Sequence, residues 1–280
     1  MTTPANHGPT LIELPDLEQG SEEWHAQRRG IVTASVVGNL ITVGSRTAID
    51  YDCPDCGAQA NDPCRSKVKA GAVIKTLHSD RTAAAAAGRS TIVFGVAKGD
   101  TARGITTHLV AERITNWTDP TYVSDDMLRG VFDEPLARDK YAEHYAPVRE
   151  TGFMIREDRG IKIGYSPDGL VGDDGLIEVK SRRQKKQVET VLSGHPPAEN
   201  IAQLQCGLLV SGRKWIDYIS YSGGMHLWVH RVYPDQRWFD AILAAVEAFE
   251  ENAREMQRIY EESVVGFPMT ERIVEQEMVI

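Results

Sequence analysis

The spacing of hydrophobic residues near the N-terminus predicts two short helices after an irregular start. Residues 1–20 are rich in Pro, Thr and Gly and are expected to be a loosely structured lead-in. Ser21 is followed by acidic residues, the usual composition of a helix N-terminus, so a short helix is expected to begin there. A second helix is expected to begin at Thr33 or Ser35, because the apolar residues that follow recur at helical spacing.

Longer segments with apolar residues at intervals of three and four predict further helices. They are residues 101–117, 125–145, 198–210 and 239–262, the last of which is a long helix that closes the domain. Pro135 limits the second helix and should lie near its first turns or at a kink, because proline removes a backbone donor.

The region between these helices has the two-residue period of strands. Apolar and polar residues alternate over residues 153–166 around a turn-forming sequence, which predicts a hairpin. A short strand is expected over residues 176–180 after a turn at 173–175, and a second hairpin over residues 215–232 with Gly223–Gly224 at its tip. Together the elements predict an α+β fold with a mostly antiparallel or mixed central sheet flanked by helices.

Residues 49–82 contain few large apolar side chains and are expected to be an inserted module. Four of its residues have the spacing of a zinc site: Cys53, Cys56, Cys64 and His78. Three thiolates and one imidazole would form a closed tetrahedral shell around a structural Zn²⁺, which such a segment would need in order to fold. The alternative is a redox C-x-x-C motif, but the expected βαβ pattern is missing and Cys64 would have no role. Cys206 is expected to be a small buried hydrophobe.

Composition and charge restrict the class of protein. The chain has 280 residues, of which 41% are hydrophobic and 25% are charged, a balance typical of globular proteins. No apolar run is long enough to cross a bilayer and the start does not resemble a secretory signal, so a cytoplasmic protein is expected. The net charge of −9 argues against a protein that only coats nucleic acid, but a nuclease remains possible because bound cations would face the phosphate.

The strand over residues 176–180 carries the candidate chemistry. Side chains alternate along a strand, so Glu178 and Lys180 share one face. Asp168 lies ten residues before Glu178, and a hairpin of that length can place the two side by side. Two carboxylates with the Val179 carbonyl would hold Mg²⁺ (or Mn²⁺), while Lys180 would orient and help to deprotonate the attacking water. The alternative is an ordinary ion pair on a solvated edge strand.

The arrangement P-D-x(9)-E-x-K resembles the signature of the PD-(D/E)XK nuclease superfamily. Residues 18–235 resemble its YqaJ-type viral recombinase branch, the lambda exonuclease-like family. Four blocks carry the resemblance in order: QGSEEWHAQRRGIVTAS, GVFDEPLARDKY, GYSPDGLVGDDGLIEVK and AQLQCGLLVSGRKW. The resemblance implies a restriction-endonuclease-like core, with residues 1–280 as one nuclease domain that contains the zinc module.

The resemblance also implies roles for individual side chains. Metal binding or catalysis would involve Asp168, Glu178, Lys180, Glu134, Asp158 and Gln203. Glu134 would assist the second metal or its waters, Asp158 would be a further carboxylate beside the site, and Gln203 would assist the nucleophile or the scissile phosphate. Relatives commonly have Tyr three residues before this Gln, where this chain has Asn200, so that supporting role stays open.

A pocket for the 5′-phosphate of the digested strand is implied as well. Arg28 and Ser35 would bind the phosphate, joined by Ser166; an arginine with a hydroxyl near a helix start suits that purpose on general grounds. Without the resemblance, Arg28 would be interpreted as a solvated surface residue and Trp24 as a core residue. Two basic clusters could guide DNA or could be ordinary solvated or structural residues: Arg182, Arg183, Lys185 and Lys186, and in the module Arg65, Lys67, Lys69 and Lys75.

The sequence therefore predicts a Mg²⁺-dependent 5′→3′ exonuclease of double-stranded DNA in viral recombination. By resemblance, such enzymes form a ring of three subunits and pass the 3′ overhang to a single-strand annealing protein. One alternative is an endonuclease or a single-strand-preferring nuclease on the same core. Another is a catalytically idle DNA-binding scaffold, which the intact set of Asp168, Glu178 and Lys180 disfavours.

Overall fold

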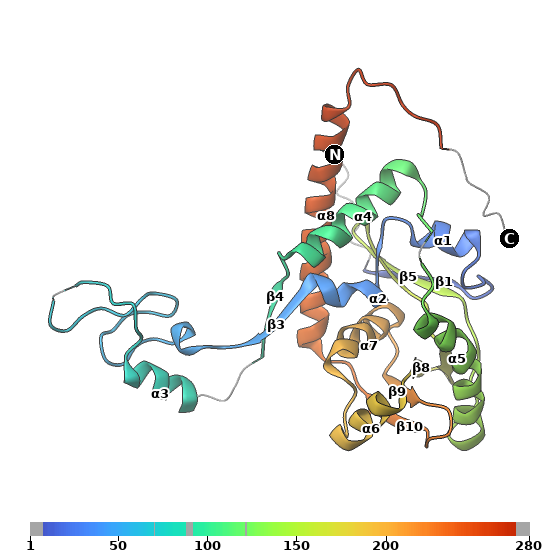
Figure 1. Cartoon of the computed structure of the whole chain (residues 1–280), viewed down its shortest axis with the longest axis horizontal. Coiled ribbons are helices and arrows are strands. Elements are labelled where there is room, and N and C mark those ends of the chain that lie inside the picture. The colour runs from blue at the N-terminus through green and yellow to red at the C-terminus, as the bar shows by residue number, and fades with distance from the viewer. Residues whose placement is uncertain (1–7, 70, 88–91, 121, 273–280) are drawn as a thin grey trace.

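In residues 8–69, 71–87, 92–120 and 122–272, which the computed structural model describes, two four-stranded sheets form the body of the protein (Figure 1). The first contains, in spatial order, β1 (Thr10–Leu14), β5 (Phe153–Asp158), β6 (Ile161–Tyr165) and β2 (Val32–Thr33). The second contains, in spatial order, β10 (Trp228–Val232), β9 (Trp215–Tyr221), β8 (Gly175–Ser181) and β7 (Gly169–Val171).

Each sheet combines parallel and antiparallel pairs. β6 pairs with β5 antiparallel and with β2 parallel, and β8 pairs with β7 antiparallel and with β9 parallel. The prediction of an α+β fold with mixed strands and flanking helices is therefore confirmed, but the strands are divided between two sheets. The division falls between β6 and β7, where Pro167 has no N–H to extend a ladder.

The N-terminal lead-in is more ordered than its composition indicates. Thr10–Leu14 forms β1 and pairs antiparallel with β5 along its whole length. The expectation of an irregular segment is wrong for these residues, because their pairing partner lies far along the chain and leaves no local signal. Residues 1–7 of the expected lead-in lie outside the described residues.

Helices occur where the hydrophobic spacing predicts them. They are α1 (Glu22–Arg28), α2 (Ala34–Val37) with the 3-10 turn η1 (Gly38–Leu40), α4 (Asp100–Thr115), α5 (Asp125–His144), α7 (Ala198–Ser211) and α8 (Gln236–Ser263). An additional helix, α6 (Gln184–Ser193), was not predicted. The Ser21 side chain caps α1 by accepting the Trp24 N–H at 3.1 Å. Pro135 lies in the middle of α5 rather than in its first turns, and the helix continues past it.

Helix α7 contacts both sheets and forms the centre of the core. It packs against β5 and β6 of the first sheet and against β9 of the second. Its side chains Leu204, Cys206 and Leu208 are buried. Burying one leucine side chain contributes about 1.5–3 kcal/mol, so this helix holds the two sheets firmly together. Among the described residues, no helix combines the length and the apolar character that a membrane crossing needs.

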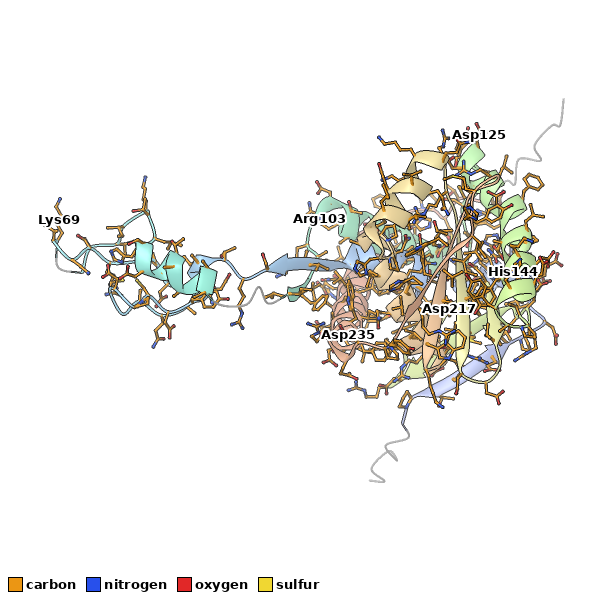
Figure 2. The ribbon with its side chains drawn as sticks, turned by 90° about the horizontal axis from the view of Figure 1, so that it is seen from below. Lys69, Arg103, Asp125, His144, Asp217 and Asp235 are labelled. Atoms are coloured by element: carbon orange, nitrogen blue, oxygen red, sulfur yellow. The ribbon has the colours of Figure 1, made fainter. Side chains whose placement is uncertain are left out.

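A two-stranded hairpin carries the cysteine-rich residues away from the sheets (Figures 1 and 2). Its strands are β3 (Ile41–Ser45) and β4 (Ile92–Val96), which pair antiparallel. Beyond them lie η2 (Ala48–Asp50) and α3 (Ser79–Ala87). We call residues 46–87 the cysteine module; Figure 2 shows Lys69 at its far end. Helix α3 begins within residues 49–82, the expected module, and continues through the alanine run 83–87.

A buried hydrogen bond attaches α5 to the second sheet. The Tyr141 hydroxyl donates to Asp217 Oδ2 at 2.6 Å, and Asp217 is 2% exposed on β9. Arg231 on β10 donates two N–H groups to the same carboxylate, each at 2.8 Å. Burial and this carboxylate raise the pKa of Tyr141, so the hydroxyl keeps its proton. Because α5 also carries Glu134, the contact sets the position of Glu134 relative to the sheet.

Replacement of Tyr141 by Phe should lower the free energy of unfolding by about 1–2 kcal/mol, because the buried Asp217 carboxylate loses a donor. Urea denaturation followed by circular dichroism measures the change. Tyr145→Phe is the matched control, since Tyr145 stacks on Tyr141 but is 56% exposed. Its effect should stay within about 0.5 kcal/mol. Equal effects of the two substitutions would contradict the role of the buried bond.

Candidate active site and metal centres

One cavity collects most of the residues that the sequence analysis singles out. Its volume is about 350 Å³, and it lies where β8, α5, α7 and the α1–α2 segment meet. The predicted residues that line it are Arg28, Ser35, Glu134, Ser166, Asp168, Glu178, Val179, Lys180 and Gln203. Both parts of the motif and segments that lie far apart in the sequence are thus brought to one place.

The antiparallel pairing of β7 with β8 brings the P-D and E-x-K parts of the motif together. Asp168 Oδ2 accepts the Val179 N–H at 2.6 Å. Glu178 and Lys180 share one face of β8, and Lys180 Nζ donates to Glu178 Oε1 at 2.7 Å. β8 is an interior strand of its sheet and Glu178 is 2% exposed, so the alternative of a solvated edge-strand pair is wrong.

Three side chains from different elements donate to the Glu178 carboxylate. Besides Lys180, Gln203 Nε2 on α7 donates to Oε1 at 2.5 Å, and the Tyr165 hydroxyl at the end of β6 donates to Oε2 at 3.1 Å. Tyr165 is buried, and burial and the nearby Glu178 charge raise its pKa, so it remains a donor. Donors on both oxygens hold Glu178 in one orientation.

The carboxylates of the cavity repel one another. Burial and the charges of Glu178 and Glu134 raise the pKa of Asp168 well above its ordinary value, and burial raises the pKa of Glu134. Burial opposes the charge on Lys180, but the neighbouring Glu178 and Asp168 carboxylates raise its pKa overall, so it is a cation. Oxygen ligands crowded in this way are stabilised by a divalent cation, and the donor set fits Mg²⁺.

Arg138 and Tyr165 belong to this site, although the sequence analysis did not single them out. Arg138 donates to Glu134 Oε1 at 2.5 Å and to the main-chain carbonyl of Asp168 at 3.0 Å. Arg138 follows Glu134 by one helical turn, and this spacing is the feature of the sequence that could have identified it. Tyr165 directly precedes Ser166 in a matching block, but nothing local shows that its hydroxyl faces Glu178.

A second group on the cavity wall contains Arg28, Ser35 and Ser166. The Arg28 guanidinium lies 4.0 Å from the centre of the Trp24 ring, and Trp24 Nε1 donates to Ser166 Oγ at 3.0 Å. Ser35 Oγ lies 3.1 Å from Thr33 Oγ1. Burial lowers the pKa of Arg28 to about 10, so it is still a cation at neutral pH. Arg28 is therefore not a solvated surface residue, and Trp24 connects Arg28 to Ser166 instead of filling the core.

Asp158 lies at the opposite end of the β5–β6 hairpin and does not line the cavity. It pairs with Ile161 at the turn, whereas Met154 pairs with Tyr165 beside the cavity. The four residue steps from Met154 to Asp158 along the strand correspond to about 13 Å. Its carboxylate faces Arg159 at 3.5 Å. The expectation that Asp158 is a further carboxylate of the site is therefore wrong.

Asn200, whose supporting role the resemblance leaves open, does not line the cavity either. Its Oδ1 accepts hydrogen bonds from Arg182 and, at 3.4 Å, from the Tyr218 hydroxyl. Tyr218 pairs with Glu178 across β9 and β8, so its hydroxyl reaches Asn200 from the sheet. Arg182 is thus partly buried. The other members of its basic cluster are exposed: Arg183, Lys185 and Lys186.

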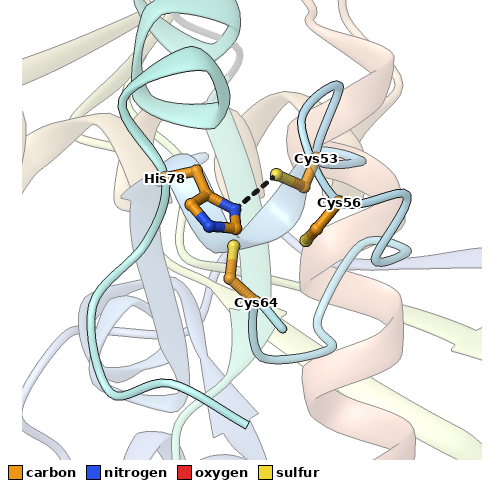
Figure 3. Close-up of side chains that lie close together, drawn as sticks. All are labelled: Cys53, Cys56, Cys64 and His78. Carbon is orange, nitrogen blue, oxygen red and sulfur yellow. Dashed lines mark hydrogen bonds between the residues drawn. The ribbon is translucent and has the colours of Figure 1, made fainter. Parts of the chain in front are cut away.

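Four potential zinc ligands meet in the cysteine module (Figure 3). The ligand atoms of Cys53, Cys56, Cys64 and His78 all lie within 4.8 Å of one another. Zn–S bonds of about 2.3 Å place tetrahedral ligand atoms about 3.8 Å apart, so the cluster has nearly the size of a zinc shell. The Arg65 backbone N–H donates to Cys56 Sγ at 3.4 Å and lowers the pKa of Cys56 to about 6, which favours the thiolate.

The fourth cysteine of the chain, Cys206, lies outside the module. Cys206 is 0% exposed within α7, and burial raises its pKa to about 12, so the expectation of a small buried hydrophobe is confirmed.

The position of Cys64 bears on the redox alternative, which leaves this cysteine without a role. Cys64 lies inside the four-residue cluster, so the redox alternative is not supported. Lys67 pairs with Asp55. The other members of the module's basic cluster are exposed: Arg65, Lys69 and Lys75.

The fold resembles that of an alkaline exonuclease, LHK-Exo, from Laribacter hongkongensis. The chains are 24% identical, with a TM-score of 0.64 over 89% of this chain and 100% of that one. LHK-Exo in complex with dAMP gives a TM-score of 0.62 at 24% identity and the same coverage. A phage-related exonuclease from Haemophilus somnus 129PT is 13% identical, with a TM-score of 0.45 over 83% of this chain and 96% of that one. No curated protein matches the chain.

The fold and the carboxylate–lysine site together define an enzyme of the nuclease class. Residues 23–214 match the family described as the YqaJ-like viral recombinase domain, and the chain belongs to that family. The resemblance based on four sequence blocks is therefore confirmed.

Proposed function

We propose that the protein is a Mg²⁺-dependent exonuclease that digests one strand of double-stranded DNA from a 5′-phosphorylated end. One observation carries the proposal: a single cavity of about 350 Å³ contains both the carboxylate–lysine cluster and the group of Arg28, Ser35 and Ser166. A cationic anchor so close to a hydrolytic centre suits a strand end, where a terminal phosphate lies near the first phosphodiester bond.

The carboxylate cluster would hold the cation. Asp168, Glu178 and the Val179 carbonyl are the proposed ligands, with Glu134 from α5 assisting a second ion or its waters. The bound Mg²⁺ would polarise the phosphodiester and stabilise the leaving oxygen. Arg138 holds Glu134 toward this cluster, because it donates to Glu134 and to the chain at Asp168.

Lys180 and Gln203 would position the attacking water and the scissile phosphate. Both donate to Glu178 Oε1, at 2.7 Å and 2.5 Å, so their donor groups converge on the proposed metal ligand. Since the carboxylates keep Lys180 charged, its contribution is to orient the water and to stabilise negative charge on the phosphate.

Arg28, Ser35 and Ser166 would bind the terminal 5′-phosphate. A guanidinium with hydroxyl donors forms charge-assisted hydrogen bonds with phosphate oxygens. Trp24 would hold this group in shape, because it stacks on Arg28 and donates to Ser166. Anchoring at the 5′ end gives digestion in the 5′→3′ direction and leaves a 3′ overhang. The family description supports a role in viral recombination. By the resemblance stated above, a ring of three subunits would pass that overhang to an annealing protein.

The cysteine module would bind one structural Zn²⁺ through Cys53, Cys56, Cys64 and His78. All four positions of a tetrahedral shell would be filled by protein, which leaves no site for substrate. Its buried core consists of Cys53, Ala58 and Cys64, with three partly buried residues packed against it, so the metal would supply most of its stability.

Replacing Lys180 or Glu178 with Ala should reduce DNA hydrolysis by at least about 10²–10³-fold while the fold stays intact. Glu178→Ala should also weaken Mg²⁺ binding, whereas Lys180→Ala should not, because an ammonium is not a ligand. Release of acid-soluble nucleotides measures the first effect and titration calorimetry the second. Asp158→Ala is the matched control and should keep wild-type activity, since Asp158 lies outside the cavity. Near wild-type hydrolysis by Lys180→Ala would contradict the assignment.

Purified protein should contain about one zinc ion per chain. Substitution of Cys64 by Ser or of His78 by Ala should release it and make residues 46–87 sensitive to proteolysis. Cys206→Ser is the control, because its thiol lies in the core of the body and is remote from the module. Elemental analysis after purification under reducing conditions, without chelators, provides the measurement. Zinc-free wild-type protein would refute the proposed centre.

The decisive experiment compares DNA ends. Losing a charge-assisted phosphate contact costs about 1.5–3 kcal/mol, so 5′-hydroxyl duplex ends should be digested roughly ten- to a hundredfold more slowly than 5′-phosphorylated ends. Arg28→Ala should slow digestion of the phosphorylated end and reduce this difference. The rates are measured on linear duplexes labelled at either end, with and without Mg²⁺. An endonuclease on the same core would also nick covalently closed circular DNA, and comparable cleavage of circles would overturn the proposal.

A further inference from the structure

Arg81 on α3 is the largest fully buried side chain among the described residues, at 0% exposure. It lies in the cysteine module, three residues after His78. No carboxylate among the described residues forms an ion pair with it, and that of nearby Asp50 instead accepts hydrogen bonds from Thr47. A buried, unpaired guanidinium is costly, so its charge needs another partner.

Every N–H group of the guanidinium has an acceptor. The backbone carbonyls that it reaches, at 2.7–2.9 Å, belong to Ile49, Tyr51, Gln59 and Asp62. The fifth N–H donates from Nη1 to Cys64 Sγ at 3.4 Å. These acceptors lie in the two loops that carry the cysteines, whereas Arg81 belongs to the helix that follows His78. The side chain therefore joins the two halves of the ligand set.

The charge of the metal centre supplies the missing partner. Three thiolates, one neutral imidazole and Zn²⁺ carry a net charge of −1. Arg81 carries +1 and touches one of the thiolates. We propose that Arg81 is the charge-neutralising and positioning residue of the zinc centre: it makes the partly buried site electrically neutral and holds the cysteine loops against the helix that follows His78. The inference rests on the zinc centre proposed above.

A purely structural role for Arg81 makes a different prediction. If it only caps backbone carbonyls, its removal should weaken zinc binding equally whatever the charge of the ligands. If Arg81 also neutralises the centre, its replacement should lower the zinc affinity less in a Cys64→His variant. In that variant two thiolates and two imidazoles leave the zinc site with no net charge. The comparison of the two backgrounds separates the two roles.

The test measures the affinity of the full-length protein for Zn²⁺ by competition with a chromogenic chelator. Arg81→Gln should lower the affinity about 10–100-fold, the usual effect of removing a partner that supports a metal ligand. Arg81→Lys keeps the charge but not the five-donor fork and should lose less. Arg65→Gln is the matched control, because Arg65 is exposed and contacts Cys56 through its backbone only, and it should bind like the wild type. Cobalt absorption spectra report whether each variant keeps its tetrahedral thiolate shell.

In the Cys64→His background, Arg81→Gln should cost several-fold less affinity than in the wild type. Zinc affinity of Arg81→Gln equal to that of the wild type would overturn the inference, and so would an equal loss in both backgrounds or a loss in Arg81→Lys as large as in Arg81→Gln. Failure of the wild-type protein to bind zinc would instead overturn the proposed zinc centre itself. The two failures are therefore distinguishable.

Discussion

The burial of Glu178 beside Asp168 is the constraint on which the active site depends. Two carboxylates in one cavity repel each other, and burial strengthens the repulsion because less water screens it. Donors from distant elements offset part of this cost: Tyr165 from β6, Gln203 from α7 and, through Glu134, Arg138 from α5. The cavity therefore exists only when both sheets, α5 and α7 are assembled, and its excess of negative charge is what a divalent cation would relieve.

The proposed phosphate-binding group of Arg28, Ser35 and Ser166 is connected to this centre through the chain itself. Ser166 and Asp168 lie two residues apart in the connection between β6 and β7, which limits their separation to about 7 Å. Ser166 accepts a hydrogen bond from Trp24, and Asp168 accepts one from the backbone of β8. Both ends of the connection are therefore fixed in position. Covalent geometry thus limits the distance between the proposed anchor and the proposed hydrolytic centre to the scale of one or two nucleotides along a strand.

The cysteine module follows a different principle from the body. The body is stabilised by apolar burial around α7, whereas the module has only a small buried cluster and relies on directed polar contacts. Arg81 illustrates the difference, because a single side chain provides hydrogen bonds to a segment that has only this small apolar cluster to hold it. Binding or loss of the proposed zinc ion should for this reason affect the module more than the two sheets beside the candidate active site.

The sequence by itself determined the features that depend on near neighbours. Helical and strand periods, the Ser21 cap and the spacing of Asp168, Glu178 and Lys180 could be recognised because each is a local pattern repeated over a few residues. The cysteine cluster was recognisable for the same reason, since ligand spacing is a property of the chain.

Only the tertiary structure decided what depends on contacts between distant segments. The pairing of Thr10–Leu14 with β5, the division of the strands into two sheets and the convergence of Tyr165 on Glu178 leave no trace in local patterns. The position of Asp158 was decided in the same way: the resemblance suggested a role, but the register of its hairpin places it at the far end of the strand. Hydrophobic spacing specifies which face of an element is buried, whereas the partner that covers this face is chosen by the packing of the whole chain.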